Sequence, residues 1–172
     1  YNIGEIAQAV NTLEKMLNSP KLLTRNSKNV VNVDEDFKAE VAKDYTVFLA
    51  HDSRVSMADI NKVFSLSPRS SRIENVSFLA KELERLGRNQ QSEEAFELLI
   101  EKTSDPEVRM EALVYLANLK LKGKQKTAVL PYLKRAFRNW RSLDGCKNPK
   151  QCEELKSRVR TLVFDWNRME KK

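Results

Sequence analysis

The chain has 172 residues, of which 41% are hydrophobic and 32% are charged, and its formal net charge is +7. This length and apolar content suffice for one hydrophobic core or a short run of helical repeats, which argues against an intrinsically disordered protein. Glycine occurs only four times, whereas average usage would give about twelve, so β-rich folds and glycine-rich phosphate loops are disfavoured. No run of 18 apolar residues occurs, and no membrane span is predicted.

The first part of the chain is predicted to form helices interrupted by one loop. Apolar residues recur at helical spacing over residues 2–18 and again over residues 34–49. Residues 20–33 contain Pro, Thr, Asn and Ser without a clean period, which indicates a loop. A short strand at residues 30–33 is the alternative there.

Capping signals mark several later helix starts. Ser56 with Asp59, and Ser71 with Glu74, have the spacing of a capping box, in which each side chain satisfies a free amide of the first helical turn. Asp105 stands before a proline at the first helical position. The apolar periods then predict helices through residues 57–64, 76–86, 95–100, 110–119, 130–140 and 155–166, with a start or a kink near Pro131 and a further capping signal at Asn148.

Two of these helices end at glycines that are 36 residues apart, Gly87 and Gly123. Aligning the chain on them gives two helix-turn-helix units with similar patterns. The matching positions are Leu79, Ala80 and Leu83 with Tyr115, Leu116 and Leu119 before the glycines, and Ser92 and Phe96 with Ala128 and Tyr132 after them.

A small residue followed four positions later by an aromatic one, after a glycine that ends the first helix, resembles the tetratricopeptide repeat over residues 72–140. The resemblance implies antiparallel helix pairs stacked as an α-solenoid, within a chain that is predicted to be all-α. Residues 1–70 are expected to add N-terminal helices, and residues 71–172 to contain the repeats and a C-terminal capping helix; one continuous domain is the alternative to this division. A generic helical bundle is the alternative. The resemblance also implies a concave groove for a partner, for which the candidate residues are Asn75, Glu82, Arg109 and Asn118.

The positive charge is concentrated between residues 120 and 141. This segment has eight bases and no acid, so the rest of the chain sums to −1. The eight residues are Lys120, Lys122, Lys124, Lys126, Lys134, Arg135, Arg138 and Arg141. They predict a basic ridge, which is either a solvated face without a partner or a site that binds an acidic partner protein, with nucleic acid as the alternative partner. A neighbouring stripe at helical spacing consists of Leu130, Leu133, Phe137 and Trp140. This spacing places Phe137 and Trp140 in the core rather than in contact with the nucleobases of a nucleic acid.

Cys146 and Cys152 flank a turn, and a disulfide between them is one interpretation. It would imply an oxidising compartment such as a periplasm, whereas two thiols in a reducing cytosol are the alternative. A zinc site would need two further ligands, and His51 is far away in the sequence.

The chain has no phosphate-binding loop, paired-histidine metal motif or nucleophile elbow. We therefore expect a protein-binding scaffold module rather than an enzyme, with no cofactor. The oligomeric state does not follow from the sequence.

Overall fold

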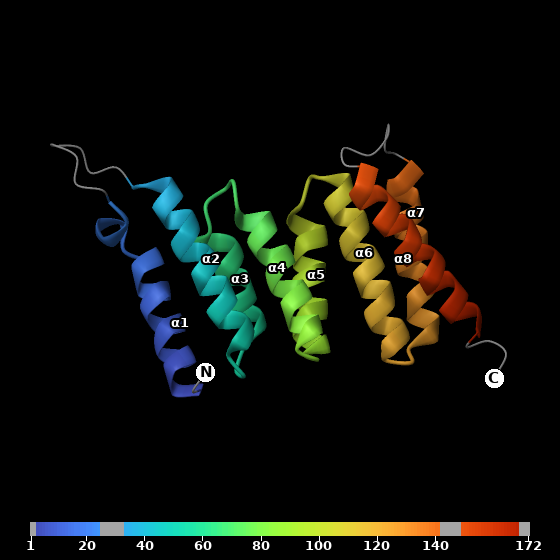
Figure 1. Cartoon of the computed structure of the whole chain (residues 1–172), viewed down its shortest axis with the longest axis horizontal. Coiled ribbons are helices and arrows are strands. Elements are labelled where there is room, and N and C mark those ends of the chain that lie inside the picture. Colours follow the sequence, from blue (N-terminus) through green and yellow to red (C-terminus); the bar gives the residue numbers. More distant parts are fainter. Residues whose placement is uncertain (1–2, 25–32, 142–148, 169–172) are drawn as a thin grey trace. The chain divides into compact units, whose positions relative to one another are not determined.

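The computed structural model describes residues 3–24, 33–141 and 149–168, and these residues are almost entirely helical (Figure 1). The predicted all-α class is confirmed for this part of the chain. Thr24 and Val33 form an isolated antiparallel bridge, while the rest of the alternative strand at 30–33 lies outside the described residues. The elements are α1 (Ile3–Leu17), the short 3-10 helix η1 (Pro20–Leu23), α2 (Glu35–His51), α3 (Met57–Leu66), α4 (Arg72–Arg85), α5 (Asn89–Lys102), α6 (Pro106–Lys122), α7 (Lys126–Arg141) and α8 (Pro149–Arg168).

The helix starts show which capping predictions hold. The hydroxyl of Ser56 accepts from the amide of Asp59, whose carboxylate accepts from the amide of Ser56, so this capping box is confirmed. Asp105 caps α6 as predicted. The box at Ser71 is wrong, because this residue already has helix-like backbone angles (φ −115°, ψ −9°) and its side chain makes no capping hydrogen bond. Its amide donates to the carbonyl of Pro68 instead, so the chain enters α4 through a turn.

The chain divides into two compact units, residues 1–95 and 96–172. The division falls inside α5 and differs from the predicted boundary after residue 70. The reason is that α4 packs against both α2 and α3 and therefore belongs with the N-terminal helices.

In the first unit, α2 packs against α1 and α4, and α3 packs against α4. Tyr45 of α2, Ile60 of α3 and Leu79 of α4 are fully buried. Small side chains lie where α5 begins against α4: the hydroxyl of Ser92 donates to the carbonyl of Ala80 at 2.8 Å, and both residues are fully buried. The contact is close because neither side chain is large.

The turns that end α4 and α6 have the same local geometry. The left-handed residue is Gly87 (φ 75°) in the first turn and Lys124 (φ 58°), not Gly123, in the second. In each turn, the amide of the following residue donates at 2.8 Å to the carbonyl five residues earlier. The structural repeat from Gly87 to Lys124 is therefore 37 residues, one more than the sequence alignment assumed.

This shift of one residue changes the correspondence between the two hairpins. In the corrected alignment, Ala80 matches Ala117 instead of Leu116, and Ser92 matches Val129 instead of Ala128. All four of the matched residues Ala80, Ser92, Ala117 and Val129 are fully buried. Because one residue turns a helix by about 100°, the correction rotates the predicted faces of α7.

In the second unit, α6 packs against α7 and α8. Apolar side chains cover most of its circumference, as is typical of a central helix. The ring of Phe96 stacks on that of Tyr115, with centroids 4.9 Å apart. Two clusters hold the three helices together, one formed by Met110, Leu113, Val114, Ala136 and Leu155 and the other by Ala117, Leu121, Val129 and Leu162. Among the helices described, none combines the length and apolar content needed to cross a membrane.

Candidate functional site

Helix α7 has two apolar faces, and only one of them packs against α6. Val129 and Ala136 are buried, and Trp140 packs partly buried against the same core. The neighbouring Leu130 and Phe137 are 36% and 62% exposed. Trp140 therefore packs against the core as predicted, whereas the prediction that Phe137 is a core residue is wrong. The prediction assigned the stripe that contains Leu130 and Phe137 to the packed face of α7, whereas the structure packs Val129 and Ala136 against α6 instead.

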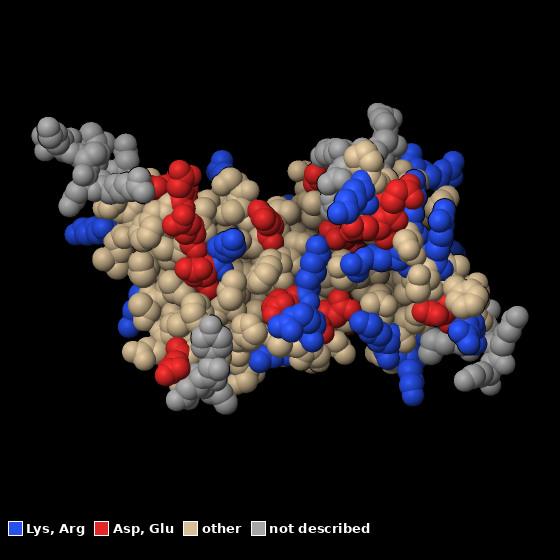
Figure 2. Space-filling view, in the orientation of Figure 1, with Lys and Arg blue, Asp and Glu red and all other residues tan. Residues whose placement is uncertain are grey.

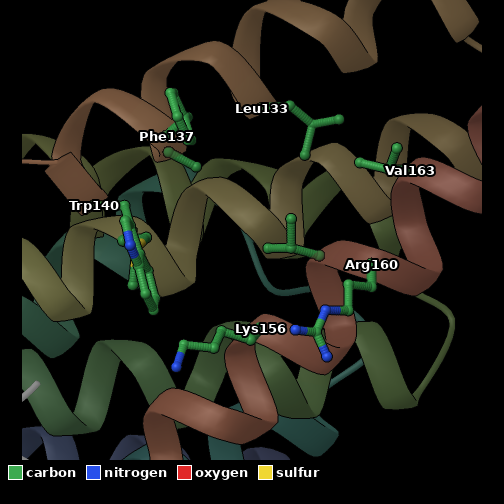
Figure 3. Close-up of a pocket in the computed structure, with 9 residues that line it drawn as sticks. Leu133, Phe137, Trp140, Lys156, Arg160 and Val163 are labelled. Atoms are coloured by element: carbon green, nitrogen blue, oxygen red, sulfur yellow. The ribbon is translucent and has the colours of Figure 1, made fainter.

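The exposed apolar face of α7 continues onto α8 across a hollow, which we call the α7–α8 groove. One end of the groove encloses about 400 Å³. Figure 3 shows Leu133, Phe137 and Trp140 around the same opening as Val163, Arg160 and Lys156. Its apolar lining consists mainly of Leu130, Leu133, Phe137 and Trp140 of α7 and Val159, Val163 and Trp166 of α8.

Four basic residues line the same groove and define its basic rim. Lys134 and Arg138 come from α7, and Lys156 and Arg160 come from α8. The two bases on each helix are four residues apart, so they lie one turn apart on the same side of that helix. No acidic side chain is among the described residues that line the groove.

One acidic residue, Glu153, lies near the rim bases of α8. Lys156 forms an ion pair with the exposed Glu153, and its ammonium group also lies over the ring of Trp140, 5.6 Å from the centroid. The hydrogen bond from Lys156, followed by the charges of Lys156 and Arg160, holds the pKa of Glu153 below its usual value.

The eight bases predicted as one ridge do not share one face. Lys134 and Arg138 line the α7–α8 groove. Arg135, although adjacent in sequence, lies in a different hollow together with Glu97 and Glu101 of α5. The helical turn of about 100° per residue separates these sites.

The remaining bases are spread along the second unit. Lys126 lies over the ring of Trp166, 5.9 Å from the centroid, near one end of the groove. On the face drawn in Figure 2, acidic side chains lie among the Lys and Arg side chains of the C-terminal helices. Lys120 and Lys122 are in the last turn of α6, Lys124 is in the following turn, and Arg141 ends α7.

Two of the four residues predicted for a concave groove make contacts within the fold. Asn75 is only 6% exposed, and its amide donates to the hydroxyl of Ser67 at 2.9 Å, so its assignment to an open groove is wrong. The guanidinium of Arg109 donates to the carbonyls of Ile100 and Thr103. Arg109 thereby connects the first turn of α6 to the end of α5.

The other two predicted residues are nearer the surface but lie in different units. Glu82 accepts from the guanidinium of Arg85 at 2.9 Å and lies 3.7 Å from the imidazole of His51. The hydrogen bond from Arg85 lowers the pKa of Glu82, against the opposing effect of burial. Asn118 lines a small hollow between α6 and α8 together with Tyr115 and Arg158.

The residues that α8 contributes to the groove were not predicted from the sequence. Lys156, Arg160 and Val163 lie on a helix for which only a packing role was predicted. No sequence signal marked them, because apolar residues at 159, 162, 163 and 166 have the i, i+3, i+4, i+7 spacing of a single packed face. Leu162 is buried against α6 and α7, and the 37% exposed Val163 faces the groove.

The predicted disulfide involves Cys146, which lies outside the described residues. Cys152 is buried in the first turns of α8. The bridge stays a prediction, and counting free thiols in the unreduced, denatured protein tests it. Elsewhere in the described chain, no three His, Cys, Asp or Glu side chains gather in a way that would hold a metal ion.

No protein-family model, curated protein or solved structure matches this chain.

Proposed function

We propose that the chain is a protein-binding module that holds an apolar segment of a partner protein in the α7–α8 groove. The observation that carries the proposal is the exposed apolar lining, above all Phe137 at 62% exposure, in a hollow bordered by bases. Fully burying a side chain of this size contributes roughly 1.5–3 kcal/mol. Contiguous apolar surface within a polar border is typical of interaction sites.

We further propose that the helix pairs α2/α3, α4/α5 and α6/α7 are arranged as in a tetratricopeptide-like solenoid. Equivalent first helices contact each other within each unit, α2 with α4 and α6 with α8. The two turns of equal geometry, 37 residues apart, support the same arrangement. In this scheme α8 is the first helix of a pair, and the α7–α8 groove lies where its second helix would pack.

Capture of partners from an extract of the source organism, with chemical crosslinking, tests the proposed function. The wild type is compared with Phe137→Asp, which puts a charge into the groove, and with Phe78→Asp. Phe78 is a matched control, because it is 43% exposed but lies on α4 in the other unit. We expect a partner that the wild type and Phe78→Asp retain and Phe137→Asp loses. Equal recovery by both variants would show that the groove is not the binding site.

Nucleic-acid binding through residues 120–141 is the alternative, and the dispersal of these bases weighs against it. Titrating labelled single- and double-stranded nucleic acids at two salt concentrations separates the two functions, because phosphate contacts give an affinity that falls steeply with salt. Salt-dependent binding that Phe137→Asp leaves unchanged would replace our proposal with the alternative.

A further inference from the structure

We infer that the occupant of the α7–α8 groove is an amphipathic helix of a partner protein, with acidic residues on both flanks of its apolar face. The inference rests on the proposed function and specifies the chemistry of the partner. Three features of the groove lead to it: its walls, its length and the placement of its bases.

The walls favour a helix over an extended peptide. Both are α-helices, whose backbone groups already bond within each helix, so the groove offers side chains and no free backbone edge. An extended segment lying on this apolar surface would leave part of its own backbone unsatisfied, at a cost of about 1–3 kcal/mol for each buried group. A helix satisfies its backbone internally and presents only side chains, as in other helix-in-groove complexes.

The length of the groove sets the length of the occupant. Its lining extends from Leu130 to Trp140 on α7 and from Lys156 to Trp166 on α8. At 1.5 Å per residue, each wall is about 15 Å long. A helix of about three turns therefore covers it, with apolar residues at spacings of three and four contacting Phe137 and Val163.

The bases stand on both walls, and this placement determines the charge of the occupant. Lys134 and Arg138 are one turn apart on α7, and Lys156 and Arg160 are one turn apart on α8. A helix lying between them brings each of its flanks beside one pair of bases. Acids spaced by three or four residues on each flank match these pairs, and bases there would be repelled.

The same charges disfavour other occupants. A second copy of this chain docked groove to groove would oppose two basic rims. A nucleic acid would contact the rim but would leave the apolar lining of Phe137 and Val163 exposed to water. An anionic membrane surface shares the charge of an acidic helix, and the experiment below distinguishes the two.

The two tryptophans of the chain provide a direct readout. Trp140 lies at one end of the groove and Trp166 at the other, and the sequence contains no further tryptophan. The intrinsic fluorescence of the full chain therefore reports occupancy. The probes are two designed helical peptides of about fourteen residues without aromatics, identical on the apolar face and carrying Glu or Lys on both flanks.

We expect the Glu peptide to bind saturably and shift the emission, and the Lys peptide to bind at least about tenfold more weakly. Raising the salt concentration should reduce this preference. The double charge reversal R138E/R160E should abolish it, because each wall then carries one base and one acid. Arg135→Glu is the matched control for charge on the same helix, and it should leave the preference unchanged because Arg135 lies in a different hollow.

Each other outcome overturns the inference in a distinguishable way. Equal binding of both peptides, lost in Phe137→Asp, would refute the acidic character while supporting the groove as a binding site. Binding of neither peptide would refute the helical occupant, and the capture experiment would then decide the proposed function separately. Displacement of the Glu peptide by anionic phosphatidylglycerol vesicles that themselves shift the emission would identify a membrane surface instead. If Arg135→Glu changed the preference as much as R138E/R160E does, the preference for the Glu peptide would reflect only the net charge of the chain and not the bases of the groove.

Discussion

Two phenylalanines of the second unit should respond very differently to truncation to alanine. Phe96 is fully buried and its ring stacks on that of Tyr115. Truncating a buried phenylalanine costs about 3–5 kcal/mol of unfolding free energy, since transfer and cavity effects add. Phe137 is 62% exposed, so little more than a third of its surface is removed from water.

The expected cost for Phe137 follows from this exposure. A phenylalanine buries on the order of 200 Å² when fully enclosed. A third of that, at about 25 cal/mol per Å², gives an upper value of about 2 kcal/mol. The β-carbon is retained in alanine and the unfolded chain is partly compact, so we expect about 1 kcal/mol.

Urea unfolding followed by circular dichroism measures both variants. With a slope of about 2 kcal/mol per molar, Phe96→Ala should lower the midpoint by about 2 M and Phe137→Ala by about 0.5 M. Phe78→Ala, at an exposed position of the first unit, serves as a control and should resemble Phe137→Ala. Equal losses for Phe96→Ala and Phe137→Ala would mean that the outer face of α7 is covered, and the α7–α8 groove would not exist as described.

Four further predictions concern the repeat turns, the interhelical contact, a helix cap and pH. Gly87→Ala should destabilise the fold by about 1 kcal/mol, because the backbone of Gly87 is left-handed, with a φ of 75°. Gly123→Ala should be neutral or should stabilise the fold by up to about 1 kcal/mol. Thermal unfolding of the two variants compares these effects. Ser92→Leu should cost about 1–3 kcal/mol by overpacking in urea titrations, and Ser92→Ala clearly less. Asp105→Ala should cost about 1 kcal/mol by loss of the cap, and Asp105→Asn should restore most of it. Burial raises the pKa of Asp52, but hydrogen bonds from the side chain and backbone of Arg54, with the charges of Arg54 and Arg88, outweigh it and lower the pKa overall. The stabilisation is therefore complete above the ordinary carboxyl pKa and is lost as the pH falls through the lowered pKa of the folded state. Asp52→Asn should flatten the acid limb of a stability-against-pH curve.

Local signals allowed most helices to be predicted from the sequence. Where one side chain caps one helix, as at Ser56 and Asp105, the necessary atoms are neighbours in the chain, and the prediction holds. At Ser71 the same residue pattern fails. The turn from Pro68 already satisfies the amide of Ser71, one of the two amides that a capping box would bond. That turn depends on the path of the chain between α3 and α4, which the capping pattern does not contain.

The α7–α8 groove was not predicted, because α7 has two apolar faces and the wrong one was assigned to the core. Either Val129 with Ala136 or Leu130 with Phe137 fits the helical period, and the sequence alone does not say which pair meets α6. The structure selects the smaller pair, since Val129 and Ala136 allow close approach of the helices. Aligning the repeats on glycines hid this choice, because Lys124 rather than Gly123 takes the left-handed conformation.

The side chain of Arg88 bears on how the first unit opens. Its guanidinium donates to the carbonyls of Ala50, His51 and Asp52, which are 36 to 38 residues earlier in the chain. These carbonyls lie at the end of α2, whereas Arg88 immediately precedes α5. Fraying of the last turn of α2 therefore removes an anchor from the start of α5. In hydrogen exchange, amides of these two segments should lose protection together, as parts of one cooperative unit.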